Sequence, residues 1–252
     1  MSILFIGCFA TGFAQINPAT PKSGHALTED FILQNQHYPE TELANKTSGE
    51  VVVSFHLDEK GMGSDYQIKE SFSEAANADA LDLVKKILWE PAMQNMLPVA
   101  VDMDYTVKYH AKSYKRYWKK HERIEIPLVL EADNSYNIYE IYQLEETAKP
   151  YFADGGNMAN YILHNLEYPE AAKATEVSGT VTLSFIVETD GSVSNIIVKN
   201  SVGGGCDNEA IRLLQDTHWI PAVKNGKYVR SHNTQDITFN IGSRNYQDGN
   251  SY

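Results

Sequence analysis

Cysteine is nearly absent from this sequence, which holds only Cys8 and Cys206 among its 252 residues. So few thiols exclude a scaffold stapled by several disulfides and a zinc site built from cysteines. If the N-terminal leader described below is removed, Cys206 is the one thiol left. We expect it to be buried and unreactive, with pairing between two chains as the alternative.

Basic residues, prolines and long apolar runs are also scarce. The 21 Lys and Arg face 33 Asp and Glu, for a net charge of −12. This balance argues against a nucleic-acid partner, because phosphate binding needs a basic surface. Nine prolines in a chain that is 42% hydrophobic indicate a globular protein. Beyond the N-terminus no run approaches the roughly 20 apolar residues of a membrane-spanning helix, so we expect the mature protein not to span a membrane.

The N-terminal residues predict export. An apolar stretch, Ile3 to Ala10, precedes the small residues that end at Ala14, which is the order of a signal peptide and its cleavage site. We therefore predict that residues 1–14 are removed and that the protein is periplasmic. Two alternatives remain open here: an N-terminus that stays in place, and a lipoprotein anchored through Cys8.

An internal repeat with a period of 130 residues is the strongest signal in the sequence. Residues of the same type recur in register across about 80 positions, without a gap, which chance does not explain. The matched pairs include Tyr38 with Tyr168, Pro39 with Pro169, Gly49 with Gly179, Phe55 with Phe185, Gly61 with Gly191, Trp89 with Trp219 and Pro91 with Pro221.

Both copies show the same order of secondary-structure signals. Apolar residues alternate over 51–57 and 181–187, which predicts half-buried strands. A glycine turn, a second strand, a helix and a closing strand follow. In the first copy, Asn77 is a candidate N-cap of the helix that follows the second strand. Short helices are expected before each first strand. We predict an α+β fold of two tandem modules, at 25–111 and 149–242, each a small antiparallel sheet with helices on one face.

The segment between the modules, residues 112–148, has a different character. Residues 112–123 combine six Lys and Arg with three aromatic residues. Such a run suits a membrane surface or a glycan strand, although a solvated helix or strand face is the plainer interpretation. Residues 124–130 and 136–144 are predicted to pair as a hairpin.

The second copy resembles the C-terminal domain of TonB energy transducers, of the kind common in Bacteroidota. The resemblance covers about 90 residues and depends on an ordered set of motifs rather than on any one of them. The first copy is a divergent member that lacks the opening Gly-Gly-Asn of residues 155–157. The positions that mark the family in the second copy are Tyr168, Pro169, Gly179, Phe185, Gly191, Trp219 and Pro221.

The resemblance implies a non-catalytic periplasmic module that serves TonB-dependent outer-membrane transport. Such domains grip a segment of an outer-membrane receptor by adding it as a strand to the sheet edge. The resemblance covers the binding end of a transducer, since neither an anchor helix nor a proline-rich spacer is evident. On this basis the final strand, from Tyr228 to Ile241, is the expected binding edge. The predicted partner-binding residues are Tyr228, Val229, Arg230, His232, Gln235, Asp236, Ile237 and Thr238.

No motif in the chain indicates catalysis, a metal or a cofactor. The eight histidines show no metal-ligand spacing, and His218 is expected to be structural. Gly203-Gly204-Gly205 is not followed by the lysine of a nucleotide-binding loop. We predict that the protein is not an enzyme. The alternative function is an envelope structural module that binds peptidoglycan or pairs with itself as a homodimer.

Overall fold

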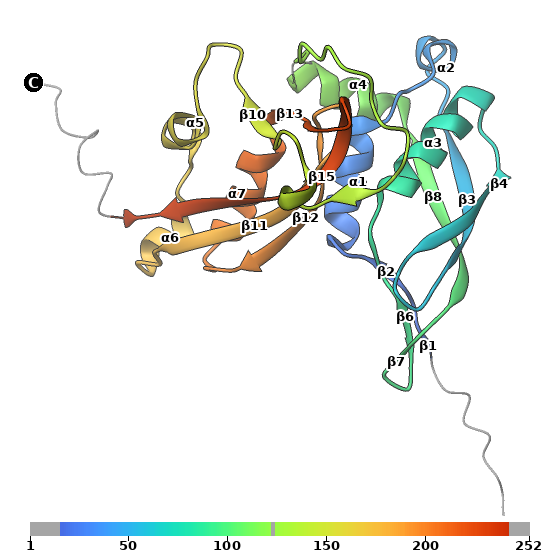
Figure 1. Ribbon diagram of the computed structural model, residues 1–252, viewed down its shortest axis with the longest axis horizontal. Helices are drawn as coiled ribbons and strands as arrows, with labels where there is room; N and C mark the ends of the chain where they lie inside the picture. The colour runs from blue at the N-terminus through green and yellow to red at the C-terminus, as the bar shows by residue number, and fades with distance from the viewer. Residues whose placement is uncertain (1–15, 122–123, 242–252) are drawn as a thin grey trace, which may run out of the picture.

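The computed structural model describes residues 16–121 and 124–241. The predicted signal peptide, residues 1–14, and the lipidation site Cys8 lie outside the described residues. Figure 1 shows two α+β modules that follow one another along the chain, the first in blue to green and the second in yellow to red.

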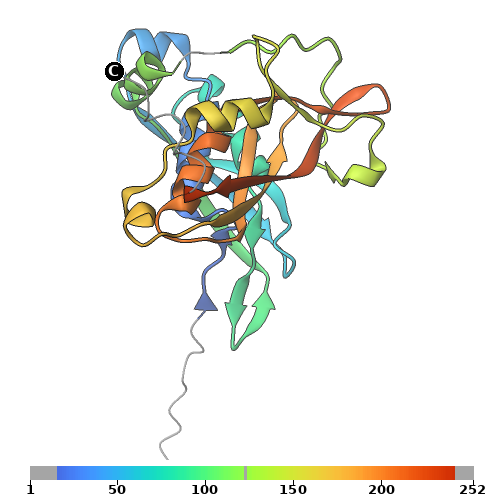
Figure 2. The same cartoon turned by 90° about the vertical axis from the view of Figure 1, so that its left-hand side faces the viewer.

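The first module is built on an antiparallel sheet of three long strands in the order β4-β3-β8. Helix α3 packs on the face of this sheet that carries the apolar residues. A small hairpin, β6–β7, pairs with β1 and projects from the body in Figure 2. The elements are β1 (Ile16–Asn17), β2 (Thr20–Pro21), α1 (Gly24–Asn35), α2 (Glu40–Ala44), β3 (Gly49–Leu57), β4 (Gly63–Glu70), α3 (Glu74–Lys86), β5 (Trp89–Glu90), β6 (Ala92–Gln94), β7 (Leu97–Val99), β8 (Val101–Tyr109) and α4 (Ala111–Lys120).

The second module repeats this plan, with a sheet in the order β12-β11-β15-β14. Here the hairpin strand and the closing strand are joined into one long strand, β15, and α7 covers the apolar face. The elements are β9 (Ile138–Tyr139), the 3₁₀ turn η1 (Ile141–Gln143), β10 (Lys149–Tyr151), α5 (Met158–Asn165), α6 (Glu170–Ala174), β11 (Gly179–Val187), β12 (Val193–Asn200), α7 (Cys206–Gln215), β13 (His218–Ile220), β14 (Ala222–Lys224) and β15 (Lys227–Phe239).

Strand register confirms the repeat residue by residue. Gly49 of β3 pairs with Tyr109 of β8, and Gly179 of β11 pairs with Phe239 of β15, so both partners shift by the 130-residue period. The irregularities in the β3–β4 ladder recur at equivalent positions in the β11–β12 ladder. A bulge changes local twist and is a specific feature of a fold, so its repetition shows that the two sheets are copies.

Each module has its own apolar core, formed as the alternation predicts. Val181, Leu183, Phe185 and Val187 point into the second core and are fully buried, as is Cys206 at the start of α7. The later part of β11 departs from the prediction, because Ser184 and Ile186 on its other face are buried as well.

The cap predicted at Asn77 is wrong. Helix α3 begins four residues earlier, with Ser73 as the N-cap, and the Ser73 hydroxyl accepts a hydrogen bond from the Ala76 amide. Asn77 therefore lies inside the helix, where its side chain donates to the Ser71 hydroxyl at 2.9 Å. Serine is as good an N-cap as asparagine, so local residue preference alone did not distinguish the two.

The segment between the modules differs most from prediction. Residues 111–120 form helix α4, so of the two forms in the plainer interpretation, a helix face or a strand face, the helix is the one present. The hairpin expected from 124–130 and 136–144 does not form. Instead β9 pairs in parallel with β15 of the second module. Of the two predicted strands, only residues 138–139 therefore pair as a strand, and their partner is distant in the sequence.

The modules pack against one another through α1 and the end of α3. Helix α1 of the first module lies beside β12, the outer strand of the second sheet (Figure 1). Asn195 of β12 accepts a hydrogen bond from the Leu88 amide at 2.8 Å and donates to the Lys86 carbonyl at 2.9 Å. Within residues 16–121 and 124–241, none of the helices is both long and apolar enough to cross a membrane.

Candidate peptide-binding edge

The predicted binding strand is β15, the longest strand of the second module. It pairs with β11 from Ser231 to Phe239, and in the three-stranded core of the sheet it is the outer member. An outer strand presents backbone amides and carbonyls that a further strand can use. The position at the sheet edge agrees with the sequence analysis for the later part of the strand only.

The first part of β15 is occupied by the protein's own linker. The Tyr228 amide donates to Glu131 O at 2.9 Å, and Tyr228 O accepts from the Asp133 amide at 2.7 Å. Arg230 and Ser231 then pair with β9. The chain has thus already added a strand to this stretch (Figure 1), and its backbone groups are not open to another peptide.

Arg230, one of the predicted partner-binding residues, is buried and does not face outward. Only 3% of its surface is exposed, and its guanidinium donates from Nε at 2.7 Å and from Nη2 at 2.8 Å to the carboxylate of the fully buried Glu188. Its Nη1 donates to Tyr136 O at 2.9 Å. Tyr228 and Val229 are also buried. The buried position of this arginine is tolerated because its guanidinium is paired with a carboxylate and hydrogen-bonded to main-chain oxygens, which offsets the cost of removing the charge from water.

The later part of β15 is open. Beyond Ser231, no strand within residues 16–121 and 124–241 pairs with its outer side. Ile237 points into the core with 1% exposure, while Asp236 and Thr238 are exposed and His232 and Gln235 are partly so.

Neighbouring β11 residues hold most of these polar side chains. The Asp236 carboxylate accepts from Thr182 Oγ1 at 2.7 Å, and the hydroxyls of Thr238 and Thr180 lie 2.9 Å apart. His232 Nε2 lies 2.7 Å from Ser184 Oγ. These contacts orient the side chains across the sheet. The linker also reaches the first of them, because Glu140 Oε2 lies 3.5 Å from His232 Nδ1.

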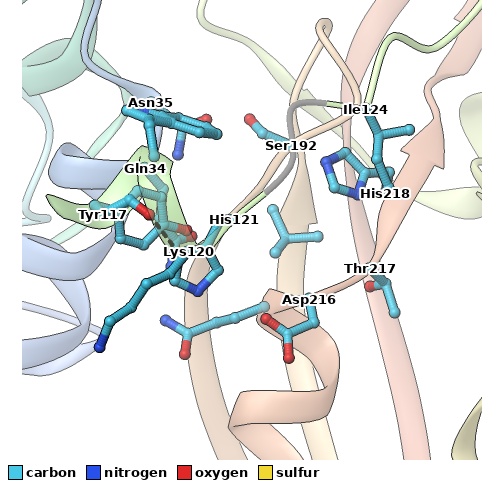
Figure 3. A pocket seen from close by; sticks show the side chains of 13 residues that line it. Gln34, Asn35, Tyr117, Lys120, His121, Ile124, Ser192, Asp216, Thr217 and His218 are labelled. Carbon is cyan, nitrogen blue, oxygen red and sulfur yellow. Dashed lines mark hydrogen bonds between the residues drawn. The ribbon is translucent and has the colours of Figure 1, made fainter. Parts of the chain in front are cut away.

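A separate concavity lies where the two modules meet. Figure 3 shows it between the end of α4, with Tyr117 and His121, and the turn from α7 to β13, with Asp216 and His218. The rings of Tyr117 and His121 stack at 4.1 Å. Burial lowers the pKa of His218 below its usual 6.5. In the described part of the chain no three His, Cys, Asp or Glu side chains are grouped to hold a metal.

Comparison with known proteins identifies the fold. The family described as "Gram-negative bacterial TonB protein C-terminal" matches twice, at residues 34–111 and 164–241. These ranges cover more than half of the chain, and one lies in each of the two modules. The chain belongs to the TonB C-terminal family. It carries two tandem copies of the family's domain. Members of the family are non-catalytic energy-transduction modules of the periplasm and envelope that interact with outer-membrane receptors and other envelope proteins.

Solved TonB C-terminal domains are among the structural neighbours. The domain from Helicobacter pylori, residues 194–285, is 23% identical, with a TM-score of 0.27, and the match covers 33% of this chain and 89% of that one. The domain from Pseudomonas aeruginosa is 25% identical, with a TM-score of 0.30, and the match covers 41% and 94%. No curated protein matches the chain.

The positions that mark the TonB C-terminal family in the sequence are structural. Trp219 is buried against Phe185, with ring centroids 5.2 Å apart, and Tyr168 donates from its hydroxyl to Val177 O at 2.5 Å. Gly191 has φ +84°, and a Cβ there would lie 2.1 Å from Trp219 O, so only glycine fits. Pro221, between β13 and β14, is buried, Pro169 is the N-cap of α6, and Gly179 begins β11.

A strand was predicted over 136–144, which contains β9, but its pairing with β15 and the role of Glu188 were not predicted. Glu188 follows directly after the apolar strand β11 and precedes the glycine turn at residue 191. Its partner Arg230 lies 42 residues away and follows the apolar pair Tyr228-Val229. An acidic and a basic residue that each extend an apolar run are the signal that could have suggested a buried pair.

Proposed function

We propose that this TonB C-terminal family protein is a periplasmic, non-catalytic binding module linked to TonB-dependent outer-membrane transport. In this proposal the second module takes up an extended segment of an outer-membrane receptor, or of another envelope protein, as an added strand. Export with loss of residues 1–14 is part of the proposal, and mass spectrometry of the native protein checks it.

The site is narrower than the sequence analysis predicted. It consists of the outer side of β15 from His232 to Phe239, because the linker occupies the stretch from Tyr228 to Ser231. The observation that supports it is this unpaired outer edge, whose exposed side chains are polar. His232, Gln235, Asp236 and Thr238 would orient the added strand, while Ile237 contributes its backbone alone.

Strand addition requires backbone amides of β15 that donate hydrogen bonds outward, and proline substitutions test this requirement. In a β-strand consecutive amides point to opposite sides, so of Gln235 and Asp236 one donates toward β11 and the other faces outward. Proline removes the amide hydrogen. We expect one of the variants Gln235→Pro and Asp236→Pro to disturb the β11 ladder and the other to keep its melting temperature. The variant that keeps its melting temperature should lose binding of receptor-derived peptides.

Side-chain changes give the matched control. Asp236→Asn or Thr238→Val leaves the backbone donors in place, so we expect binding to weaken by no more than about fivefold, a magnitude typical of one lost polar contact. Backbone amide shifts of the labelled protein would be followed on titration with the peptides.

If the well-folded proline variant binds as tightly as the unmodified protein, strand addition on β15 is wrong. Shifts on β15 with peptidoglycan fragments and none with peptides would favour the structural module. A dimer that forms as the protein concentration rises, with its contact along the outer side of β15, would favour self-association.

A further inference from the structure

Helix α4 carries a dense basic face in an otherwise acidic protein. Its cations are spaced three to four residues apart, so they share one side of the helix. The opposite side packs on the first module through the buried Tyr114, whose ring lies 5.2 Å from that of Tyr38. The exposed cations are Lys112, Lys115, Arg116, Lys119 and Lys120.

None of these five side chains forms an ion pair with any residue in the described parts of the chain. Lys115 donates from Nζ to Leu43 O at 2.8 Å, and that neutral carbonyl leaves its charge unmatched. The protein nevertheless has 33 acidic residues with which it could have paired them. Five adjacent unpaired cations repel one another, which a negatively charged partner would relieve.

A groove runs beside the basic face. It is lined by Tyr38, Pro39, Leu43, Ala75, Tyr114 and Trp118. Lys115 and Lys119 stand along its α4 side, and Glu40 of α2 stands on the other. The groove therefore offers apolar contact along its floor and positive charge along one rim.

Helix α4, apart from its first residue, lies outside the ranges that match the family's domain. The first matched range ends at residue 111, where α4 begins, and the second ends at residue 241. The matched ranges therefore do not include the five cations of α4.

We propose that α4 and this groove form a docking surface for an acidic peptide segment that carries an apolar side chain. The carboxylates of the segment would lie along the lysines, and the apolar side chain would enter between Leu43 and Trp118. A membrane fits less well, because a flat anionic surface resting on α4 would also meet the exposed Glu40. A narrow segment stays on the lysine side of the groove.

A short peptide of glutamates around one leucine, labelled with fluorescein, is the probe. Its partner probe has glutamine in place of every glutamate. We expect the unmodified full chain to bind the acidic probe despite its own net negative charge, and to lose affinity as salt is added. The glutamine probe should bind at least about tenfold more weakly, since several exposed ion pairs are lost together.

Variants locate the surface. Arg116→Glu with Lys119→Glu should weaken binding by roughly tenfold, because two attractive pairs become repulsive. Lys60→Glu with Lys199→Glu changes two exposed cations elsewhere and is the charge-matched control. Ala75→Trp, at an exposed groove position, should block the apolar side chain and leave the basic face intact.

Three outcomes would overturn the proposal. The α4 variant could bind the acidic probe as tightly as the control variant. The glutamine probe could bind as well as the acidic one. Vesicles with anionic headgroups could bind the protein through α4 while the peptide does not, which would assign the face to a membrane.

Discussion

Arg230 of the second module donates from Nη2 to the main-chain oxygen of Lys86, the last residue of α3 in the first module, at 2.9 Å. The same guanidinium holds the buried Glu188 in a two-bond contact. The C-terminus of a helix carries partial negative charge, so the positive guanidinium interacts favourably with the end of α3 and also with the Glu188 carboxylate. One side chain thus links the two modules and completes the second core. The first copy has no equivalent of this arginine, because Ala100 occupies the position 130 residues earlier.

Loss of either member of this pair should be costly. Arg230→Ala leaves the Glu188 carboxylate buried without its partner, and we expect about 3–5 kcal/mol less free energy of unfolding. Replacement of both, as Arg230→Met with Glu188→Leu, removes the unmatched charge and should cost much less. Urea denaturation of the three proteins measures this. If Arg230→Ala were no less stable than the double variant, the buried charge of Glu188 would not depend on its arginine partner.

The two repeat tryptophans allow a matched comparison. Trp219 and Trp89 are both buried, and truncation of either to alanine should destabilise its module by about 3–5 kcal/mol without any catalytic effect. Their indole nitrogens differ. That of Trp219 donates to Thr217 Oγ1 at 3.0 Å, whereas that of Trp89 has no hydrogen-bond partner among the described residues.

We therefore expect Trp219→Phe to destabilise the protein by about 1 kcal/mol more than Trp89→Phe, since only the former breaks a hydrogen bond. Thermal melts of the two variants give the difference. Equal costs, or a larger cost at Trp89, would contradict the bonding that the structure shows.

A comparison of alanine substitutions at two glycines distinguishes the cost of an unfavourable backbone conformation from the cost of a steric clash. Gly191 and Gly226 both have positive φ, +84° and +69°, but a Cβ at Gly226 would meet nothing within 4 Å. Gly226→Ala should cost about 1 kcal/mol from the backbone conformation alone. Gly191→Ala must also displace Trp219 O, so we expect at least about 3 kcal/mol. A smaller loss at Gly191 than at Gly226, measured in urea, would refute this reading.

Two histidines should titrate on opposite sides of 6.5. Burial lowers the pKa of His218, while the hydrogen bond from His56 to Asp102 at 2.7 Å raises the pKa of His56. Proton NMR of the imidazoles against pH checks both directions. If His218 titrates above 6.5, the burial that the structure assigns to it is wrong.

The two shifts affect stability with opposite signs. For His218 the unfolded chain takes up a proton more readily, so stability is lost as pH falls through 6.5 toward the folded pKa. For His56 the folded chain binds the proton more tightly, so its contribution is present below 6.5 and is lost as pH rises through the folded pKa. His218→Gln should flatten the acid side of a stability profile, and His56→Gln the neutral side.

The sequence by itself determined the two modules, their strands and the residues of their cores. The alternation in 51–57 and 181–187, the glycines at 61 and 191 and the tryptophans at 89 and 219 are local patterns that recur once in the sequence, so they are recognised without knowledge of the fold. The closing strand β15 and its place at the outer side of the sheet also followed from chain order.

Only the tertiary structure decided which part of that strand is open. The linker adds β9 beside Arg230, and Arg230 finds Glu188 and the end of α3, through contacts between segments far apart in the sequence. Strand β9 has only two residues, too few for a hydrophobic pattern to specify its register, so its pairing with β15 depends on which backbones meet in space. The basic run at 112–120 forms a helix through its own local hydrogen bonds, and the Tyr38 surface against which Tyr114 packs decides which side of α4 is buried.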